Sequence, residues 1–391
     1  MLRSRQFRLL TIHFGLYQLA VAMAGGFVGA FLLKLGFSLP QALIAYAALL
    51  ATRLALRFLS LLVVRRIGYR GSIVAGATLA GLQCAPLTRA DEPAWLALWL
   101  LALSLAEAFY WPVYHSAAAV TSETASRGRE LGLRTAIGST VGVVGPLLGG
   151  VLLQRFGPAV DFGIAGALSI AAAFPVLLMR RIEAGPVPSL AQSVRNADRQ
   201  GVLIFAADGW MAAGLAIGWP MVLYLSTGSR FEEMGFINAA SGLVGAVAGW
   251  LCGRAIDRQD RERYLALVSG ALALGLLVRA LASWVPAAAI VATATGAAVM
   301  SVYVPLMMSA VYERAKRSGA AYRFHFGLEA GWDLGAVAGC CAAATVASFG
   351  GIASLAVLPS LLGVAALYLC VRECGHRPQK RPVDVAPVPI A

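Results

Sequence analysis

Charged residues are scarce in this chain of 391 residues. Lys, Arg, Asp and Glu together make up 13% of it, and hydrophobic residues make up 59%, whereas soluble domains contain about 25% charged residues. A soluble fold of this length could not bury so much apolar surface. The composition therefore excludes a soluble globular protein and indicates an integral membrane protein.

Residues that bind metals or serve as nucleophiles are also few. The sequence has four His and six Cys, and the Cys show no metal-binding spacing, so we expect buried, reduced thiols. The sequence shows no His cluster, no carboxylate-rich metal site and no nucleophile-elbow serine. We therefore expect no enzymatic activity, no metal and no cofactor.

Apolar runs, in contrast, are plentiful. Each is roughly 20 residues long, which is enough to cross a bilayer as a helix. Gly, Pro and charged residues separate the runs, and no run alternates as a strand would, so we predict an all-α integral membrane fold with twelve transmembrane helices. The predicted spans lie near residues 9–33, 40–63, 71–88, 94–119, 132–154, 159–179, 201–226, 234–253, 264–283, 287–312, 322–347 and 352–371.

The spans divide into two sets of six. Residues 1–179 and 201–372 are predicted to form two pseudo-symmetric six-helix bundles. Residues 180–200 would link them, and the proline-containing segment 373–391 would be a disordered tail.

The two halves echo each other at an offset of 193 residues, although Ala and Gly are abundant enough for chance matches. A duplicated half in a membrane protein favours a transporter whose site lies between the halves. The matching pairs are Tyr110 with Tyr303, Pro112 with Pro305, Ser116 with Ser309, Ala117 with Ala310, Gly138 with Gly331 and Gly142 with Gly335.

The net charge of +13 is unevenly distributed. Lys and Arg gather in the loops on one side of the predicted membrane, and the loops on the other side hold only Lys34, Arg89, Arg155 and Arg230. This bias predicts that both termini are cytoplasmic. It also indicates a multi-pass protein of the inner (plasma) membrane that contacts the lipid bilayer and binds no nucleic acid.

A basic motif follows the eighth run, from Gly253 through Asp257 to Arg258. It resembles the G-x-x-x-D-R/K-x-G-R/K-R/K signature of the major facilitator superfamily (MFS), with Asp260 in place of the second Gly. The copy after the second run is poorer, since Arg65 stands where the Asp belongs. The resemblance covers almost the whole chain. It implies transport by alternating access, with Asp257 latching the cytoplasmic side at a helix N-terminus. The alternative is an ordinary solvated loop charge.

A glycine-rich segment occupies the fifth run. It resembles a motif that the superfamily associates with antiporters, especially drug/proton exporters. Small residues would let this helix pack closely against the eighth, and its proline would bend it where the halves rock. The alternative is close packing without a role in coupling. The residues are Gly142, Gly145, Pro146, Gly149 and Gly150.

Ionisable groups in the middle of a membrane helix cost at least about 2.5–3.5 kcal/mol each, so each needs a partner or a function. Arg53 and Arg57 lie four residues apart on the second helix, and Glu329 and Asp333 lie four apart on the eleventh. The resembled fold packs these helices together across the interface, which predicts the pairs Arg57–Glu329 and Arg53–Asp333. The pairs could be static bridges or a gate, and the two Arg could instead bind an anion directly.

Two further carboxyl groups, Glu107 and Asp208, fall on helices that line the cavity of the resembled fold. An apolar cavity favours the protonated form of a carboxyl group, which suits both residues to carry a proton. Alternatively, Glu107 neutralises Arg53, and Asp208 caps backbone N–H groups at a helix break near Gly209.

Other residues carry weaker signals. Tyr110 and Tyr303 are candidates to wall an amphipathic substrate, although Tyr is also an ordinary interface anchor. Arg279 is expected to reach the lipid headgroups. His115 is expected to be a hydrogen-bonded packing residue, with a proton relay as the alternative.

Together these patterns predict a monomeric secondary active transporter. It would export a small amphipathic or anionic molecule in a proton-coupled reaction. A second hypothesis is uptake of a small organic anion bound by Arg53 and Arg57. A third, from another class, is a transporter-like receptor or assembly protein without turnover.

Overall fold

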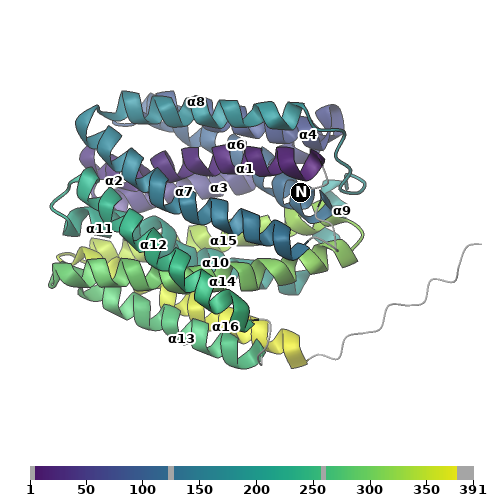
Figure 1. Cartoon of the computed structure of the whole chain (residues 1–391). Helices are drawn as coiled ribbons and strands as arrows, with labels where there is room; N and C mark the ends of the chain where they lie inside the picture. Colours follow the sequence, from purple (N-terminus) through teal and green to yellow (C-terminus); the bar gives the residue numbers. More distant parts are fainter. Residues whose placement is uncertain (1–4, 122–126, 257–260, 377–391) are drawn as a thin grey trace, which may run out of the picture.

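The computed structural model describes residues 5–121, 127–256 and 261–376. Within these ranges every regular element is a helix, and long helices run side by side to form an elongated bundle (Figure 1). The all-helical prediction is confirmed.

The first half contains eight α-helices and one short 3-10 helix. They are α1 (Arg5–Ala24), η1 (Gly25–Phe27), α2 (Val28–Lys34), α3 (Leu39–Leu56), α4 (Phe58–Leu82), α5 (Cys84–Leu87), α6 (Pro93–Thr121), α7 (Arg127–Arg155) and α8 (Pro158–Leu177).

The short helix α9 (Leu190–Arg195) lies within the predicted linker. The second half then follows with one π-helix and two 3-10 turns among its helices. They are α10 (Arg199–Ala212), the π-helix η2 (Ala213–Gly218), α11 (Trp219–Ser226), α12 (Phe231–Ile256), α13 (Arg261–Ala280), η3 (Leu281–Ser283), α14 (Pro286–Arg317), α15 (Ala321–Ser348), η4 (Ala353–Val357) and α16 (Ser360–His376).

Among the described residues, eleven segments are long and apolar enough to cross a bilayer. The remaining predicted span, near residues 71–88, is divided between the end of α4 and α5. Helix α4 turns sharply at Gly68, whose φ of +73° is a conformation that favours glycine. Its first part continues the second span and its last part begins the third, which accounts for the twelve predicted helices.

Helix–helix packing repeats from one half to the other. In the first half α1 packs against α7 and α8, and α6 packs against α3 and α4. In the second half α10 packs against α15 and α16, and α14 packs against α12 and α13. These are the same partners in the same chain order, as expected of two pseudo-symmetric six-helix bundles.

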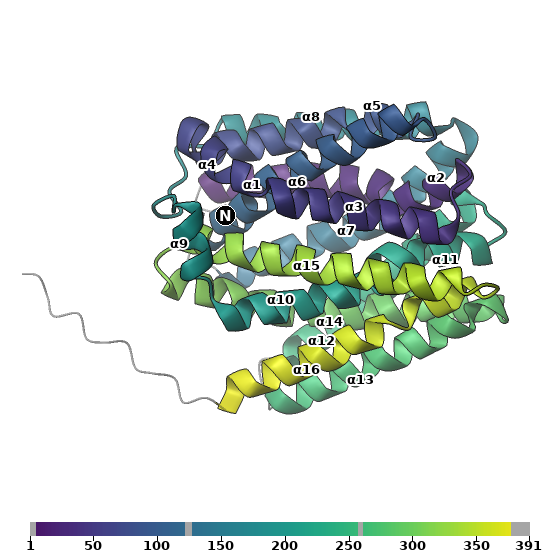
Figure 2. The ribbon, with the colours of Figure 1, turned by 180° about the vertical axis from the view of Figure 1, so that it is seen from behind.

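Two helix pairs make the most extensive contacts between the halves, α3 with α15 and α7 with α12, and α6 also contacts α14 and α15. Both pairs lie side by side in the two opposite views (Figures 1 and 2). The N-terminus, α9 and the end of α16 lie at one end of the bundle, which we call the linker end. Helices α2 and α11 lie at the other, which we call the far end.

At the far end the halves also touch through polar groups. Arg155 pairs with Glu232 at 2.7 Å, and the backbone N–H of Phe231 donates to Gln154 Oε1 at 2.9 Å. Lys34 Nζ lies 5.2 Å from the centre of the Phe231 ring. The start of α12 is therefore held against the ends of α2 and α7.

Candidate functional site

A cluster of buried charges lies where α3, α6 and α15 meet. Arg53 Nε donates to Asp333 Oδ1 at 2.7 Å, and Arg53 also pairs with Glu107. Arg57, four residues further on at the C-terminal cap of α3, pairs with the second oxygen of Asp333. The exposed fractions of Arg53, Arg57 and Asp333 are 4%, 2% and 0%. One carboxylate of the second half therefore bridges two guanidinium groups of the first. We call these residues, with Glu107 and Glu329, the interface cluster.

Of the two predicted pairs, Arg53–Asp333 is confirmed and Arg57–Glu329 is wrong in this structure. Asp333 has two oxygens, and it uses one for each Arg. Glu329, one turn nearer the linker end, has His115 Nε2 at 3.7 Å instead. Glu107 does neutralise Arg53, which was the alternative to a role in proton transfer.

Arg57 keeps unused donors. Its Nε and Nη1 atoms are buried and have no hydrogen-bond partner among the described residues. Buried N–H groups are normally paired, because leaving a buried donor unpaired costs about 1–3 kcal/mol. The cluster can therefore accept a further anionic oxygen.

Asp208, on α10, forms a second site. Tyr303 on α14 donates its hydroxyl to Oδ1 at 2.5 Å, and Trp332 on α15 donates Nε1 to Oδ2 at 3.0 Å. The alternative of a backbone cap near Gly209 is not what the structure shows. Helix α10 continues through Gly209 to Ala212, and the irregular turn is η2, whose Gly214 N–H bonds Ser360 Oγ.

Trp332 connects the two sites. Its indole N–H reaches Asp208, and its ring lies 5.2 Å from the guanidinium carbon of Arg53. Asp333, the next residue of α15, pairs with that same Arg53.

Comparison with known families and structures shows to which family this arrangement belongs. The family model of the Major Facilitator Superfamily matches residues 10–328. The chain belongs to the Major Facilitator Superfamily. It is accordingly a membrane transporter of solutes and not an enzyme.

Solved structures of MFS transporters share the fold at low sequence identity. The transporter FucP in its outward conformation is 14% identical, with a TM-score of 0.68 over 94% of this chain and 98% of that one. An auto-inhibited peptide transporter of the POT family is 12% identical, with a TM-score of 0.70 over 97% and 99%. The human organic anion transporter MFSD10 is 14% identical, with a TM-score of 0.66 over 94% and 99%. Comparison with curated proteins gives no match.

The two tyrosines related by the repeat lie in different surroundings. Tyr303 bonds Asp208. Tyr110 has no exposed surface and lies inside the first half, where its hydroxyl meets His13 Nε2 at 3.0 Å and its ring stacks on Tyr17 at 4.0 Å. In this conformation, therefore, only Tyr303 is close to a candidate MFS substrate site, and Tyr110 has no surface to offer a solute.

The glycine-rich segment of α7 faces two neighbours. Gly145 and Gly149 pack against Ala22 and Met23 of α1. The remaining members of the segment face α12, where Gly142 lies against Gly242 and both Pro146 and Gly150 lie against Gly235. The predicted close approach of the fifth and eighth MFS helices is confirmed.

The predicted latch can be followed only in part. Gly253 lies within α12, whereas Asp257 and Arg258 lie outside the described residues. Among the residues that the structure does describe, no three His, Cys, Asp or Glu side chains are placed to hold a metal ion.

Arg279 does not reach the headgroups as expected. It is 6% exposed, and its guanidinium carbon lies 5.0 Å from the centre of the Trp219 ring. Gly296 on α14 leaves the room that the guanidinium occupies. The Nε atom has no acceptor in the described part of the chain.

The sequence reasoning missed His325 and Trp332. His325 is fully buried on α15, and its ring stacks on His115 with 5.5 Å between the ring centres. A signal was present, because His325, Glu329 and Asp333 are spaced four residues apart and so share one helix face.

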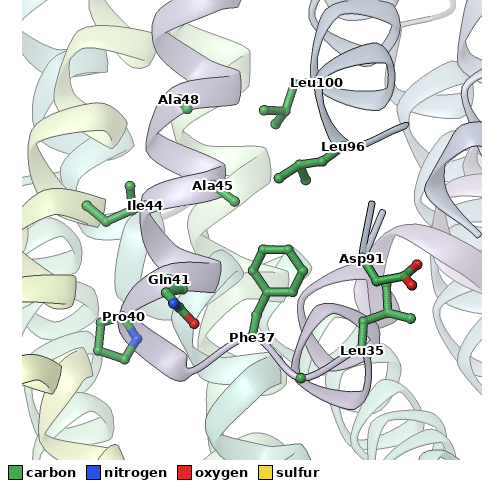
Figure 3. Close-up of a pocket in the computed structure, with 11 residues that line it drawn as sticks. Leu35, Phe37, Pro40, Gln41, Ile44, Ala45, Ala48, Asp91, Leu96 and Leu100 are labelled. Atoms are coloured by element: carbon green, nitrogen blue, oxygen red, sulfur yellow. The ribbon is translucent and has the colours of Figure 1, made fainter. Parts of the chain in front are cut away.

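An open cavity of about 660 Å³ lies at the far end, between α3 and α6. Its wall is mostly apolar, with Phe37, Ile44 and Leu96 among the lining side chains (Figure 3). Gln41 is already used as a cap, since its side chain accepts from Ser38 N. None of the predicted site residues lines this cavity.

Proposed function

We propose that the protein exports a small amphipathic or anionic solute in exchange for protons, by alternating access between its two halves. The observation that carries the proposal is the buried bridge of Asp333 to Arg53 and Arg57, which joins the halves near a half-buried carboxyl group, Asp208. We place the protein in the inner (plasma) membrane as a monomer, with both termini cytoplasmic.

The bridge suits a gate. Separating α3 from α15 would leave Arg57 and Asp333 without their partners and Arg53 with Glu107 alone, and a buried charge that loses its partner is strongly unfavourable. The free-energy cost of the separation falls when another anion takes the place of Asp333. Arg57 has two further N–H donors, so a carboxylate or phosphate of the solute can bind it once the separating helices expose them.

Asp208 suits proton binding. Its two oxygens tie α10 to α14 through Tyr303 and to α15 through Trp332. A proton turns one oxygen into a hydroxyl, which is a poorer acceptor, so the hydrogen bond that Tyr303 or Trp332 donates to that oxygen weakens. Protonation would thus change the contacts between helices that line the space between the halves.

Asp257 is the proposed latch at the cytoplasmic side, as the superfamily motif implies. Glycine contacts between α7 and α12 supply the close packing about which the halves would rock.

A second candidate is uptake of a small organic anion held by Arg53 and Arg57. The free Nε and Nη1 atoms of Arg57 favour an anionic substrate in either direction of transport.

Proton movement in liposomes tests the proposal. Purified protein is reconstituted with a pH-sensitive dye inside, and a panel of organic anions and amphipathic cations is added in turn. We expect at least one solute to move protons, and Asp208→Asn to abolish that movement while solute binding persists. Asp161→Asn is the matched control, because Asp161 is a fully buried carboxyl group within the first half and outside the interface cluster.

Two results would count against the proposal. If solute moves equally well without a proton gradient and Asp208→Asn has no effect, proton coupling through Asp208 is wrong. If an anion accumulates inside the vesicles by a route that needs Arg53 and Arg57 but not Asp208, the uptake hypothesis replaces it.

A further inference from the structure

The interface cluster contains unequal numbers of acids and bases. Arg53 and Arg57 supply two positive charges, whereas Glu107, Glu329 and Asp333 supply up to three negative ones. An unpaired charge in a membrane interior is expensive. The cluster is neutral when it holds one proton, and the geometry indicates where that proton resides.

Glu329 is the carboxyl group without an arginine partner. It is 7% exposed, and among the described residues it makes no hydrogen bond to Arg53 or Arg57. His115 on α6 lies beside it, with 3.7 Å between Nε2 and Oε1. The other ring nitrogen of His115 is 2.9 Å from the Tyr312 hydroxyl.

That second contact orients the imidazole. When Tyr312 donates to Nδ1, the neutral ring carries its proton on Nε2, which faces Glu329. When Nδ1 donates to Tyr312, a neutral Nε2 accepts from a protonated Glu329. Only the second arrangement holds the proton that makes the cluster neutral, because in the first the Nε2 hydrogen belongs to the neutral imidazole and Glu329 is a carboxylate.

Arg57 offers Glu329 a second position. The two residues interact electrostatically, and the Nε and Nη1 atoms of Arg57 are buried donors without partners in the described part of the chain. Glu329 also lies one turn from Asp333 on the same face of α15, so Arg57 is a second candidate partner for its carboxylate.

We propose that Glu329 and His115 hold the coupling proton between them, and that its release moves the Glu329 carboxylate from His115 to the unused N–H groups of Arg57. This inference rests on the proposed proton coupling and deepens it, because it assigns the proton to a site other than Asp208. Glu329 would exchange a partner on α6 for one on α3, and so change how α15 is held against the first half.

His325 extends the site toward the linker end. It lies one turn before Glu329 and stacks on His115, and neither of its buried ring nitrogens has a hydrogen-bond partner among the described residues. Titratable and charged groups face this region from every neighbouring helix, namely Arg53 and Arg57 of α3, Glu107 and His115 of α6, Asp208 of α10, Tyr312 of α14, and His325 and Asp333 of α15.

Infrared difference spectroscopy of the purified protein tests the assignment without any solute. Spectra recorded across a pH titration show the carbonyl band of each carboxyl group that loses its proton. We expect one such band to shift when only glutamate carries carbon-13 in its side-chain carboxyl, to disappear in Glu329→Gln, and to titrate at a different pH in His115→Gln.

Two comparisons keep the test decisive. The label assigns the band to a glutamate, and its dependence on His115→Gln ties it to the glutamate beside His115, so the assignment does not rest on Glu329→Gln alone. Asp161→Asn should remove no glutamate band, and any band of Asp161 should be insensitive to His115→Gln. The assignment is wrong if no glutamate band titrates, or if the titrating band survives Glu329→Gln and is lost in Glu107→Gln.

The outcome is separable from that of the liposome experiment. A glutamate proton that behaves as described, in a protein that moves no protons with any solute, would contradict the proposed function alone. Proton-coupled transport with a titrating band that belongs to Asp208, lost in Asp208→Asn, would contradict this inference and leave the proposed function standing.

Discussion

The two main interfaces between the halves, α3–α15 and α7–α12, differ in the chemistry of their contacts. At α3–α15 the contact consists of buried charges, with Asp333 shared between Arg53 and Arg57. Along the middle of α7–α12 it consists of glycines, and a Cβ atom added to Gly242 would lie 2.6 Å from the carbonyl oxygen of Gly142. Polar contacts of α7 with α12 lie at the far end, where Arg155 pairs with Glu232. The first interface depends on the protonation and ligands of its side chains. The glycine part of the second depends on how closely two backbones approach.

This difference suggests a division of labour. Van der Waals packing between small residues is insensitive to pH and to solute, and it tolerates a change of crossing angle better than interlocked large side chains would. Buried ion pairs have discrete alternatives, because each charge must find a new partner when it leaves the old one. We therefore expect the glycine interface to act as a pivot and the charged interface as a lock.

Asp333→Asn should cause the largest loss of stability. It leaves both guanidinium groups of the cluster without their shared carboxylate, which should lower the free energy of unfolding by about 3–5 kcal/mol. Thermal unfolding in detergent measures this. Glu107→Gln is the control with a smaller expected loss, because the Glu107 side chain is 23% exposed and Arg53 keeps Asp333. Equal losses in the two variants would argue that Asp333 is no more than one of several equivalent partners.

Gly242→Ala should cause the second-largest loss of stability. The added methyl group forces the α7 and α12 backbones apart, at a cost of about 1–3 kcal/mol, which exceeds the gain of about 1 kcal/mol from better helix propensity. The measurements are thermal unfolding and solute exchange in liposomes, and we expect exchange to suffer more.

Gly142→Ala is the matched control for that variant. A Cβ atom at Gly142 has nothing within 4 Å, so only the helix-propensity gain of up to about 1 kcal/mol remains. Should both variants behave alike, the α7–α12 contact would not be the sterically limiting one.

Arg279→Met should increase the stability of the protein, in contrast to Asp333→Asn and Gly242→Ala. Arg279 is a buried cation whose Nε lacks an acceptor among the described residues. Removing an unsatisfied donor should recover about 1–3 kcal/mol, against the loss of about 1–2 kcal/mol from its contact with Trp219. A small rise in melting temperature is expected. A clear fall would show that Arg279 has an anionic partner in the membrane.

Arg155→Gln should have the smallest effect. The Arg155 side chain is 63% exposed, although it pairs with Glu232 across the two halves, and exposed pairs contribute little to stability. We expect an unchanged melting temperature. A distance measurement between spin labels at the far end would show whether this pair shifts the balance between open and closed states. A large change in melting temperature would instead show that the pair stabilises the contact between the halves as the interface cluster does.

The sequence predicted the fold well, because apolar length and the repeat act over whole helices. It also predicted that α3 and α15 meet and that Arg53 pairs with Asp333. It failed on Arg57, since helical spacing gives the depth of a side chain and not which of two carboxylates one turn apart lies nearer. Arg279 was misplaced for a related reason, because the space beside Gly296 exists only once α13 and α14 are packed.

Trp332 gives the molecule a property that neither candidate site has alone. One face of its indole lies against Arg53 and its N–H is bonded to Asp208, so a single ring reports on both sites. Any ligand that displaces this ring at one site must alter the free energy of occupancy at the other. Thermodynamic linkage requires this influence to be mutual and equal in size. Binding of a proton or ligand at Asp208 and the ion pairing of Arg53 would then shift together, as parts of one equilibrium.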